Sequence, residues 1–500
     1  MRTRLVFLLA VFLLFLPAGP AGAEGELYRE EKAVAEVMDY LYRYHIARPD
    51  ARQLMQGAID GLLNSVGDPY TEYFSAGELE DFARSLEGSF AGVGLELEAC
   101  FPYPRVSGVF PGSPAFRAGI REGDLIVRVD GEETSGLDLA RVAEKIRGPA
   151  GSRLWLTVRR GGSDFDVELT REVVSSPVVE GRMLAGNIGY VKVHVFGSRT
   201  AGEFGALMRE FQSRGIGGLI LDLRGDPGGY LQAAVDLAGY FLPPGQVVAI
   251  TVDRNGREEV YSTAGENPDL DLPLAVLVDG MSASAAEVLA GALQEYHRAV
   301  LVGGRTYGKG VAQAIVPLEA GGALKITIAR FLTPSGRSID GRGIEPDRQV
   351  SVPSLQLVAA CQELQPHLPR SVTFNFAGGV MVDGERVDAV VYPLVADGEI
   401  YIPLRFTLEA LGFNVQWHPD LKQISIRTGS RELILEPGSK TVFAGGKNLK
   451  LKNLTWREGN IYLPVSPLSL LGIKVQHDAG QLKLELLPDE AGIMIPVLNH

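Results

Sequence analysis

Three residues of the chain have types and spacing suited to nucleophilic catalysis: Ser284, Lys309 and Gln313. An apolar run at Leu274–Val278 predicts a buried strand before Ser284, and the residues that follow, up to Tyr296, have the periodicity of a helix. A serine at such a strand-to-helix corner lies close to helix N–H groups. Those groups can stabilise the negative charge that forms on a carbonyl oxygen when a hydroxyl attacks it. The sequence therefore predicts a nucleophile at Ser284.

Lys309 is the candidate general base. A free lysine has a pKa of about 10.4, and lowering that pKa to about 7 requires roughly 4 to 5 kcal/mol. Burial can supply such a shift, and the neighbours of Lys309 in sequence are small or apolar, with no carboxylate among them. Gln313 could hold the neutral amine by a hydrogen bond without adding a charge. The alternative interpretation is that Ser284 caps a helix and that Lys309 is an exposed loop lysine.

These segments resemble those of the carboxyl-terminal processing peptidases, also called tail-specific proteases, of the S41 serine peptidase family. The resemblance implies that Ser284 is the nucleophile, Lys309 the general base and Gln313 the residue that positions the base. Motifs in the order typical of the family run from the region of Glu30 to that of Val352. Three further segments carry the resemblance: Leu63–Tyr73, Leu219–Gly229 and Phe331–Asp347.

The resemblance also implies the donors of an oxyanion hole, which are the turn at Gly228 and Gly229 and the backbone amide of Ala285. Family members often carry Asn where Gly225 and Asp226 stand in this chain. This difference leaves both glycines in place, so the expected backbone donors are retained.

Composition limits the classes of function. A chain of 500 residues with 46% hydrophobic residues is long enough for several packed domains. Its net charge of −13 argues against nucleic acid as a partner. The histidines are scattered without ligand spacing, so we expect neither a metal nor another cofactor. Cys100 and Cys361 favour two free thiols over a disulfide framework, although one disulfide between them stays open.

The first 23 residues have the pattern of a signal peptide: basic residues at Met1–Arg4, an apolar run at Leu5–Leu16 and small residues at Ala21–Ala23. The apolar run is short for a membrane span. Cleavage after Ala23 is the first interpretation, and an uncleaved anchor that keeps the protein at a membrane is the alternative. We expect an extracytoplasmic protein, in the periplasm or at the exterior of the cell envelope.

Residues 24–88 have apolar positions at helical spacing, which predicts a helical N-terminal arm with a packing face. In the S41 family such an arm can support dimerisation, so a homo-oligomer is an expectation here.

Residues 89–173 resemble a PDZ domain of the bacterial type. Four residues, Gly92, Val93, Gly94 and Leu95, form a turn that can aim backbone N–H groups at the terminal carboxylate of a substrate. The strand that starts at Leu95 offers an edge to which a peptide can add. The resemblance implies that the partners are protein substrates with accessible C-terminal tails. The alternative interpretation is a glycine turn between two strands.

Strand and helix patterns alternate in residues 174–352, which favours a layered α/β protease core. We expect a linker at 353–369, a strand-rich domain at 370–487 and a tail at 488–500. The strand-rich domain contains a two-fold repeat, in which the segment at Ile400–Leu404 recurs at Ile461–Val465. It resembles the stalk-like domain named after the N-terminal region of copper amine oxidases. The name implies no copper site, and a cell-envelope component is a candidate partner.

The sequence thus predicts a multidomain α+β protein with a helical N-terminal arm, a β-sandwich-like PDZ domain, a layered α/β S41 protease core and a repeated strand-rich α+β domain. Its predicted function is that of a secreted serine endopeptidase with a Ser-Lys dyad. It would hydrolyse peptide bonds in the C-terminal regions of substrates that the PDZ domain recognises. The alternative is a catalytically silent scaffold that binds tails or the envelope. The presence of Ser284, Lys309 and Gln313 argues against that alternative.

Overall fold

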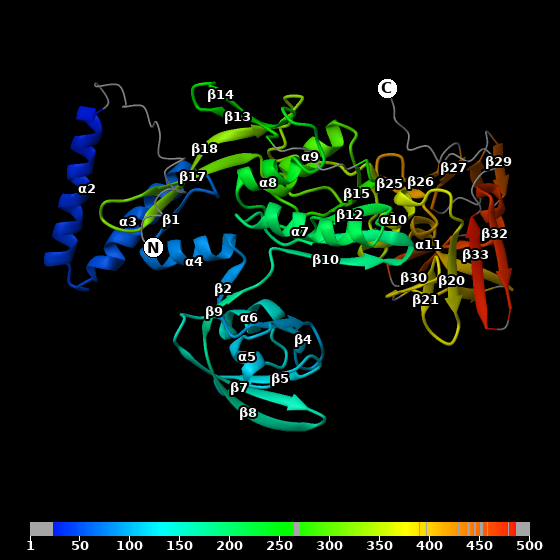
Figure 1. The fold of residues 1–500 in the computed structure, drawn as a ribbon, viewed down its shortest axis with the longest axis horizontal. Coiled ribbons are helices and arrows are strands. Elements are labelled where there is room, and N and C mark those ends of the chain that lie inside the picture. Colours follow the sequence, from blue (N-terminus) through cyan, green and yellow to red (C-terminus); the bar gives the residue numbers. More distant parts are fainter. Residues whose placement is uncertain are drawn as a thin grey trace. The chain divides into compact units, whose positions relative to one another are not determined.

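The computed structural model describes two compact units (Figure 1). Of the described residues, the first unit comprises those up to Ser176 together with Thr251–Glu259 and Val311–Phe331, and the second comprises those of Pro177–Ile250 and Val260–Gly310 and those from Leu332 onward. The described residues are 24–264, 271–389, 391–396, 398–428, 431–437, 441–444, 447–450, 454–457, 459–478 and 480–486. The expected signal peptide and the expected C-terminal tail lie outside them. No helix in these ranges is both long enough and apolar enough to cross a membrane.

The N-terminal arm is helical, as predicted. Its elements are α2 (Glu24–Tyr44), α3 (Ala51–Val66), the short strand β1 (Glu72–Phe74) and α4 (Ala76–Leu86). The expected packing face is nevertheless exposed. Val37 is 58% exposed, and α3 has no buried side chain. An amphipathic helix needs a second apolar surface to bury its stripe, and the arm's own helices do not supply enough of one.

The PDZ domain has a sheet of strand order β3-β4-β5-β7-β8, with β6 paired to β5. Strand β2 pairs with β9 where the chain enters and leaves the domain. The buried face of this sheet packs against α6 through side chains such as Ile126, Val142 and Leu156. The elements are β2 (Ser89–Gly92), β3 (Leu95–Glu98), β4 (Arg105–Val109), α5 (Pro114–Arg117), β5 (Leu125–Val129), β6 (Glu132–Glu133), α6 (Leu139–Ile146), β7 (Arg153–Arg160), β8 (Ser163–Thr170) and β9 (Glu172–Ser175).

A further five-stranded sheet has the order β1-β18-β13-β14, with β17 also paired to β18. Its remaining strands are β13 (Val247–Asp253), β14 (Glu258–Ser262), β17 (Val311–Pro317) and β18 (Ala323–Leu332).

The protease core of the second unit is built on a six-stranded sheet of order β10-β11-β12-β15-β16-β19. Strand β10 is antiparallel to β11, and the strands from β11 to β19 are mutually parallel. Helices lie in the connections from β11 through β12 and β15 to β16, which confirms the layered α/β prediction. The elements are β10 (Val179–Leu184), η2 (Ala185–Asn187), β11 (Ile188–Val193), α7 (Thr200–Ser213), β12 (Gly218–Asp222), α8 (Leu231–Ala238), β15 (Leu274–Val278), α9 (Ala285–Glu295), β16 (Val300–Gly303) and β19 (Arg348–Gln349).

The segment expected to be a linker forms a buried helix instead, α10 (Pro353–Leu364). This helix contacts β12, β15 and β16 on one side and α11 (Leu404–Ala410) on the other (Figure 1). Its residues Leu355, Ala359 and Ala360 are buried in one hydrophobic core with strand residues such as Ala275 and with C-terminal residues such as Phe374. A parallel sheet is apolar on both faces and needs cover on both, so α10 is part of the protease core.

The described residues of the C-terminal domain form three sheets, of orders β22-β21-β20-β33-β32, β23-β24-β31-β30 and β25-β26-β27-β28-β29. The two halves of the sequence repeat pair directly with each other, with Ile402 opposite Leu463 on β24 and β31. Trp417 of β25 is 42% exposed. The elements besides α11 are β20 (Arg370–Asn375), β21 (Val380–Val382), β22 (Glu385–Val387), β23 (Leu394–Ala396), β24 (Glu399–Pro403), β25 (Asn414–His418), β26 (Gln423–Thr428), β27 (Arg431–Leu435), β28 (Thr441–Ala444), β29 (Lys447–Lys450), β30 (Thr455–Arg457), β31 (Asn460–Pro464), η3 (Ser466–Leu471), β32 (Ile473–His477) and β33 (Gln481–Leu486).

Candidate active site

Ser284 lies at a sharp corner between β15 and α9. Its backbone has φ 55° and ψ −116°, and α9 begins at the next residue, Ala285. A positive φ is uncommon for a residue with a Cβ, and such strained backbone occurs often at functional sites. The residue is 8% exposed. The carbonyl of Ser284 accepts from the N–H of Val288, so the corner leads directly into the first turn of the helix.

The buried carboxylate of Glu287 joins the serine corner to the lysine loop. Its Oε2 accepts from the backbone N–H of Ser284 at 3.0 Å and from that of Lys309 at 2.8 Å. Its Oε1 accepts from the N–H of Gly308 at 2.7 Å and from the hydroxyl of Thr306 at 2.5 Å. The side chain of Glu287 is fully buried. One carboxylate therefore fixes the backbones of the candidate nucleophile and the candidate base relative to each other.

The loop that carries Lys309 has no regular secondary structure, and close backbone packing holds it in place. Gly310 lies so close to Asp340 that a Cβ at position 310 would be 2.4 Å from the backbone nitrogen of Asp340. Gly308 has φ 89°, and a Cβ there would be 2.8 Å from the nitrogen of Gly343. Only glycine fits on either side of Lys309. The lysine itself is half-buried.

Gln313 lies on β17, in the first unit, four residues after Lys309 in the sequence. The pairing of β17 with β18 shifts register between Ala312 and Gln313. Such irregularities often re-aim side chains beside active sites. The side-chain amide of Gln313 donates to the carbonyl of Val311 at 3.3 Å.

The glycine turn after β12 lies directly against the serine corner. A Cβ at Gly228 would be 2.6 Å from the carbonyl oxygen of Ala283 and 2.8 Å from the Cβ of Ser284. Gly229 has φ 147°, and a Cβ there would be 2.3 Å from the carbonyl oxygen of Phe196. Both positions therefore require glycine. The motif therefore has two consecutive glycines because other parts of the backbone pack too closely against these positions to leave room for a Cβ.

The three backbone N–H groups expected to donate to an oxyanion differ in whether they already have an acceptor. The N–H of Gly228 donates to Oδ1 of Asp226 at 2.8 Å, so it is already engaged. Within the described part of the chain, no acceptor occupies the N–H of Gly229 or of Ala285. The N–H groups of Gly229 and Ala285 are therefore available to donate to an oxyanion, whereas the N–H of Gly228 stabilises the turn.

An ion-pair cluster supports the start of this turn. Asp222 accepts two hydrogen bonds from the side chain of Arg224, at 2.9 and 2.6 Å, and one from the hydroxyl of Tyr190 at 2.7 Å. Lys192 lies 3.6 Å from the same carboxylate. Burial acts to raise the pKa of Asp222, but its hydrogen bonds and the charges of Arg224 and Lys192 outweigh burial, and the pKa is lowered. Arg224 also donates to Gln356 of α10 at 3.0 Å.

The predicted tail-binding residues lie at the open edge of the PDZ sheet. Strand β3, which starts at Leu95, is the last strand of its sheet and pairs with β4 alone. The carbonyls of Val93 and Gly94 accept from the N–H groups of Ala115 and Phe110, at 2.9 and 3.0 Å, which fixes the turn. Gly94 has φ 77° and packs tightly against the side chain of Ser113. Gly92 ends β2, immediately before this turn.

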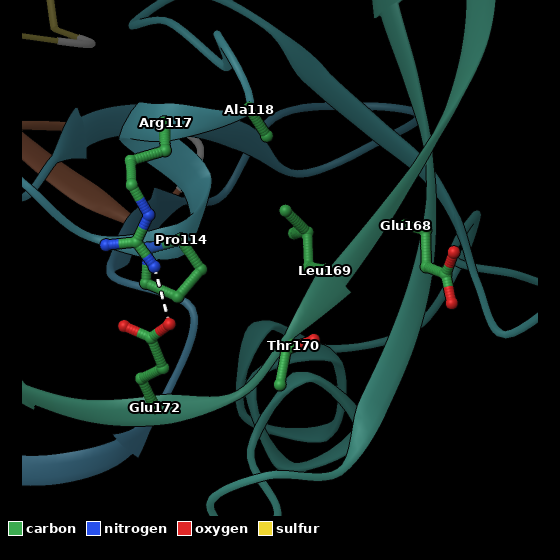
Figure 2. Close-up of a pocket in the computed structure, with 7 residues that line it drawn as sticks. All are labelled: Pro114, Arg117, Ala118, Glu168, Leu169, Thr170 and Glu172. Atoms are coloured by element: carbon green, nitrogen blue, oxygen red, sulfur yellow. Dashed lines mark hydrogen bonds and ion pairs between the residues drawn. The ribbon is translucent and has the colours of Figure 1, made fainter.

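A separate hollow of about 280 Å³ lies elsewhere on the PDZ domain (Figure 2). It is bounded by α5, by the end of β8 and by Glu172 at the start of β9. Arg117 and Glu172 form an ion pair of 2.5 Å across its rim. The hollow contains neither the predicted catalytic residues nor the predicted tail-binding residues, so we assign it no part in catalysis.

Within the described residues, both cysteines are free thiols, and no group of three or more His, Cys, Asp or Glu side chains is placed to hold a metal ion. Sequence reasoning did not assign Glu287 any role. The spacing Ser284-x-x-Glu287 could have revealed it, because a glutamate three residues after a helix-capping serine often reaches back to the backbone of the cap. Asp226 was noted only as a departure from the usual Asn.

Comparison with known proteins agrees with this architecture. Residues 187–350 match the model of peptidase family S41, residues 105–160 match a PDZ domain, and residues 381–486 match the copper amine oxidase N-terminal domain. A carboxy-terminal-processing protease of Bartonella bacilliformis is 34% identical over 356 residues, which cover 70% of this chain and 81% of that protein. A probable CtpA-like serine protease of Staphylococcus aureus is 34% identical over 325 residues, 65% of each chain.

Among solved structures, the photosystem II D1 C-terminal processing protease is 32% identical, with a TM-score of 0.42, over 65% of this chain and 88% of that one. The fold and the serine corner define a serine peptidase with an α/β core and an attached PDZ domain. The chain belongs to peptidase family S41, among the carboxy-terminal-processing serine proteases.

Proposed function

We propose that the protein is an endopeptidase that uses Ser284 as its nucleophile and Lys309 as its general base. The observation that carries this proposal is the shared carboxylate of Glu287, which accepts from the backbone N–H of both residues. A nucleophile and its base must be held together within hydrogen-bond reach to act as one unit. Ser284, at a strained strand-to-helix corner, has the backbone geometry expected of a nucleophile.

The proposed reaction starts with attack of the Ser284 hydroxyl oxygen on the carbonyl carbon of the scissile peptide bond. The neutral amine of Lys309 takes the hydroxyl proton, and the carbonyl oxygen becomes the oxyanion of a tetrahedral intermediate. The N–H groups of Gly229 and Ala285 donate to that oxyanion. Lys309 then gives its proton to the leaving amine as the carbon–nitrogen bond breaks. Water then attacks the ester carbonyl carbon of the acyl-enzyme while Lys309 takes one of its protons. The bond to the Ser284 oxygen breaks as Lys309 passes that proton to it, which restores the hydroxyl group and releases the acid. Gln313 positions the lysine amine.

We further propose that the PDZ domain selects substrates by their C-terminal tails. The turn at Gly92, Val93, Gly94 and Leu95 would bind the terminal carboxylate, and the tail would add to the open edge of β3. The signal-peptide pattern in the sequence supports action outside the cytoplasm. The exposed apolar stripe of the N-terminal arm supports association with a second copy of the chain, because such stripes are normally covered.

The experiment that tests the function incubates the purified chain with a protein substrate that has an unstructured tail, and identifies the products by mass spectrometry. We expect fragments cut within the C-terminal region, and none from the Ser284→Ala variant. A serine-reactive fluorophosphonate probe provides the matched readout, because it should label the wild-type chain and leave Ser284→Ala unlabelled. Cleavage by Ser284→Ala at the wild-type rate would rule out the assigned nucleophile.

A further inference from the structure

Asp226 is a buried acidic residue directly beneath the candidate oxyanion turn. Its side chain is fully buried. Oδ1 accepts from the N–H of Gly228 at 2.8 Å, whereas Oδ2 has no hydrogen-bond partner in the described structure. The backbone carbonyl of Asp226 accepts from the N–H of Ala283 at 3.0 Å. The residue therefore contacts both the glycine turn and the chain immediately before Ser284.

The surroundings of Asp226 do not match a permanent negative charge. The cation that acts on it is Lys192 of β11, which already interacts with Asp222 at 3.6 Å. The adjacent loop after β15 contributes another acid, Asp279, whose Oδ1 accepts from the N–H of Gly225 at 3.0 Å. Burying an unpaired carboxylate costs far more than burying a neutral carboxyl group. Burial raises the pKa of Asp226 to about 8, and the hydrogen bond from Gly228 and the charge of Lys192 offset that rise only in part.

We propose that Asp226 is a pH-sensitive positioning residue of this protease: the turn supports catalysis while its carboxyl group is protonated, and ionisation of that group slows acylation. The inference rests on the proposed function of Ser284, Gly229 and Ala285. An ionised Asp226 would place a buried negative charge against the turn that must stabilise a second negative charge, the oxyanion. In a site that excludes water, two such charges repel strongly.

The neutral carboxyl group resembles the Asn that many family members carry at this position. Both are uncharged, both offer an oxygen to the N–H of Gly228, and both can donate through their second polar atom. The difference is that the amide keeps these properties at every pH, whereas the carboxyl group loses its proton as the pH rises. Asp226 should therefore reduce the activity of this chain at alkaline pH, whereas an Asn at this position would not.

The direction of the effect follows from the raised pKa. Below about pH 8 the Asp226 carboxyl group is mostly protonated, and above it the charged form dominates. Activity should fall by about tenfold per pH unit once Asp226 is ionised. The wild-type profile of kcat/KM therefore declines at alkaline pH. The Asp226→Asn variant should lose this decline.

The test measures kcat/KM for a fluorogenic peptide from about pH 6 to about pH 10. It compares the wild-type chain, Asp226→Asn, Asp226→Ser and a control, Asp236→Asn. Asp236 lies on the exposed face of α8, the helix that follows the turn, and its replacement changes the net charge equally. We expect the alkaline fall in the wild type and in the control, and no such fall in the two Asp226 variants. The same alkaline fall in Asp226→Asn would overturn the proposal.

A second measurement is independent of whether the Asp226 variants fold. Infrared spectra of the Ser284→Ala variant, labelled with ¹³C at aspartate carboxyl groups, should show a protonated carboxyl band at neutral pH that disappears above about pH 8. Absence of that band at neutral pH would refute the assigned state of Asp226. Failure of the proposed function has a different signature, which is cleavage by Ser284→Ala or no cleavage by the wild-type chain at any pH.

Discussion

Replacing Glu287 with Gln should disable the enzyme while leaving it folded. The carboxylate accepts four hydrogen bonds, two at each oxygen. The amide keeps one acceptor oxygen and turns an NH₂ group toward the other two donors. In the most favourable orientation the NH₂ group donates to the hydroxyl oxygen of Thr306. The N–H of Gly308 then faces the same NH₂ group, which is a donor, and has no acceptor. The N–H groups of Ser284 and Lys309 then bond to a neutral oxygen.

The magnitude follows from the number of affected bonds. A buried donor left without a partner costs roughly 1 to 3 kcal/mol, and hydrogen bonds to a charged group are stronger than those to a neutral one. The free energy of unfolding should therefore fall by about 2 to 5 kcal/mol. Protein domains have roughly 5 to 15 kcal/mol of stability, so the variant should remain folded at 25 °C. Displacement of reacting groups by about 1 Å costs about 100-fold in rate, and we expect kcat/KM to fall at least that far.

The assay combines peptide turnover with thermal unfolding, both well below the Tm of the variant. Glu295→Gln is the matched control. Glu295 lies at the other end of the same helix, where it pairs with Arg337 at 3.3 Å and accepts from the N–H of Ser335 at 2.9 Å, a hydrogen bond that the amide oxygen of Gln can keep. Surface ion pairs contribute about 0 to 1 kcal/mol, so this control should keep both its Tm and its activity. A folded Glu287→Gln variant with wild-type kcat/KM would refute the role given to the shared carboxylate.

Three further predictions concern the other parts of the chain. Amidating the C-terminus of a tail-dependent substrate should raise KM, because the turn after Gly92 loses its carboxylate ligand; equal rates for the acid and the amide would show that the PDZ domain does not recognise tails. Treatment with EDTA should leave peptide turnover unchanged, and a loss that zinc restores would contradict a metal-free mechanism. A chain that ends at Leu357 should lose both its cooperative thermal unfolding and its activity, because the cut removes Ala359 and Ala360 from the core beneath β15; an active, folded protein of that length would show that α10 is dispensable.

The sequence was most informative where local chemistry determines structure. The apolar run before Ser284 and the glycines at 228 and 229 correspond to a buried strand and to close backbone contacts. The repeat in the C-terminal domain marked two equivalent segments, and in the structure these two segments pair with each other. In these cases the residues that form the sequence pattern are the same ones that make the contacts, so the structure could be predicted locally.

Features that depend on distant contacts were not predictable. The segment of α10 has little amphipathic contrast because it is covered on both sides, by the protease sheet and by α11, so its sequence suggested a linker. The role of Glu287 depends on a loop about twenty residues away that returns to its carboxylate. The exposed stripe of α2 follows the same helical pattern as a buried one, and only the fold reveals that the arm leaves it uncovered.

The most direct test of the central claim compares peptide turnover by Ser284→Ala, Lys309→Ala and the double variant, with thermal unfolding as the control for folding. Two residues that act as one unit lose their effect together, so the double variant should be no slower than either single variant. Each should fall to the background rate while its Tm stays near that of the wild type. Near-wild-type turnover by a folded Lys309→Ala variant would contradict the proposed Ser-Lys dyad.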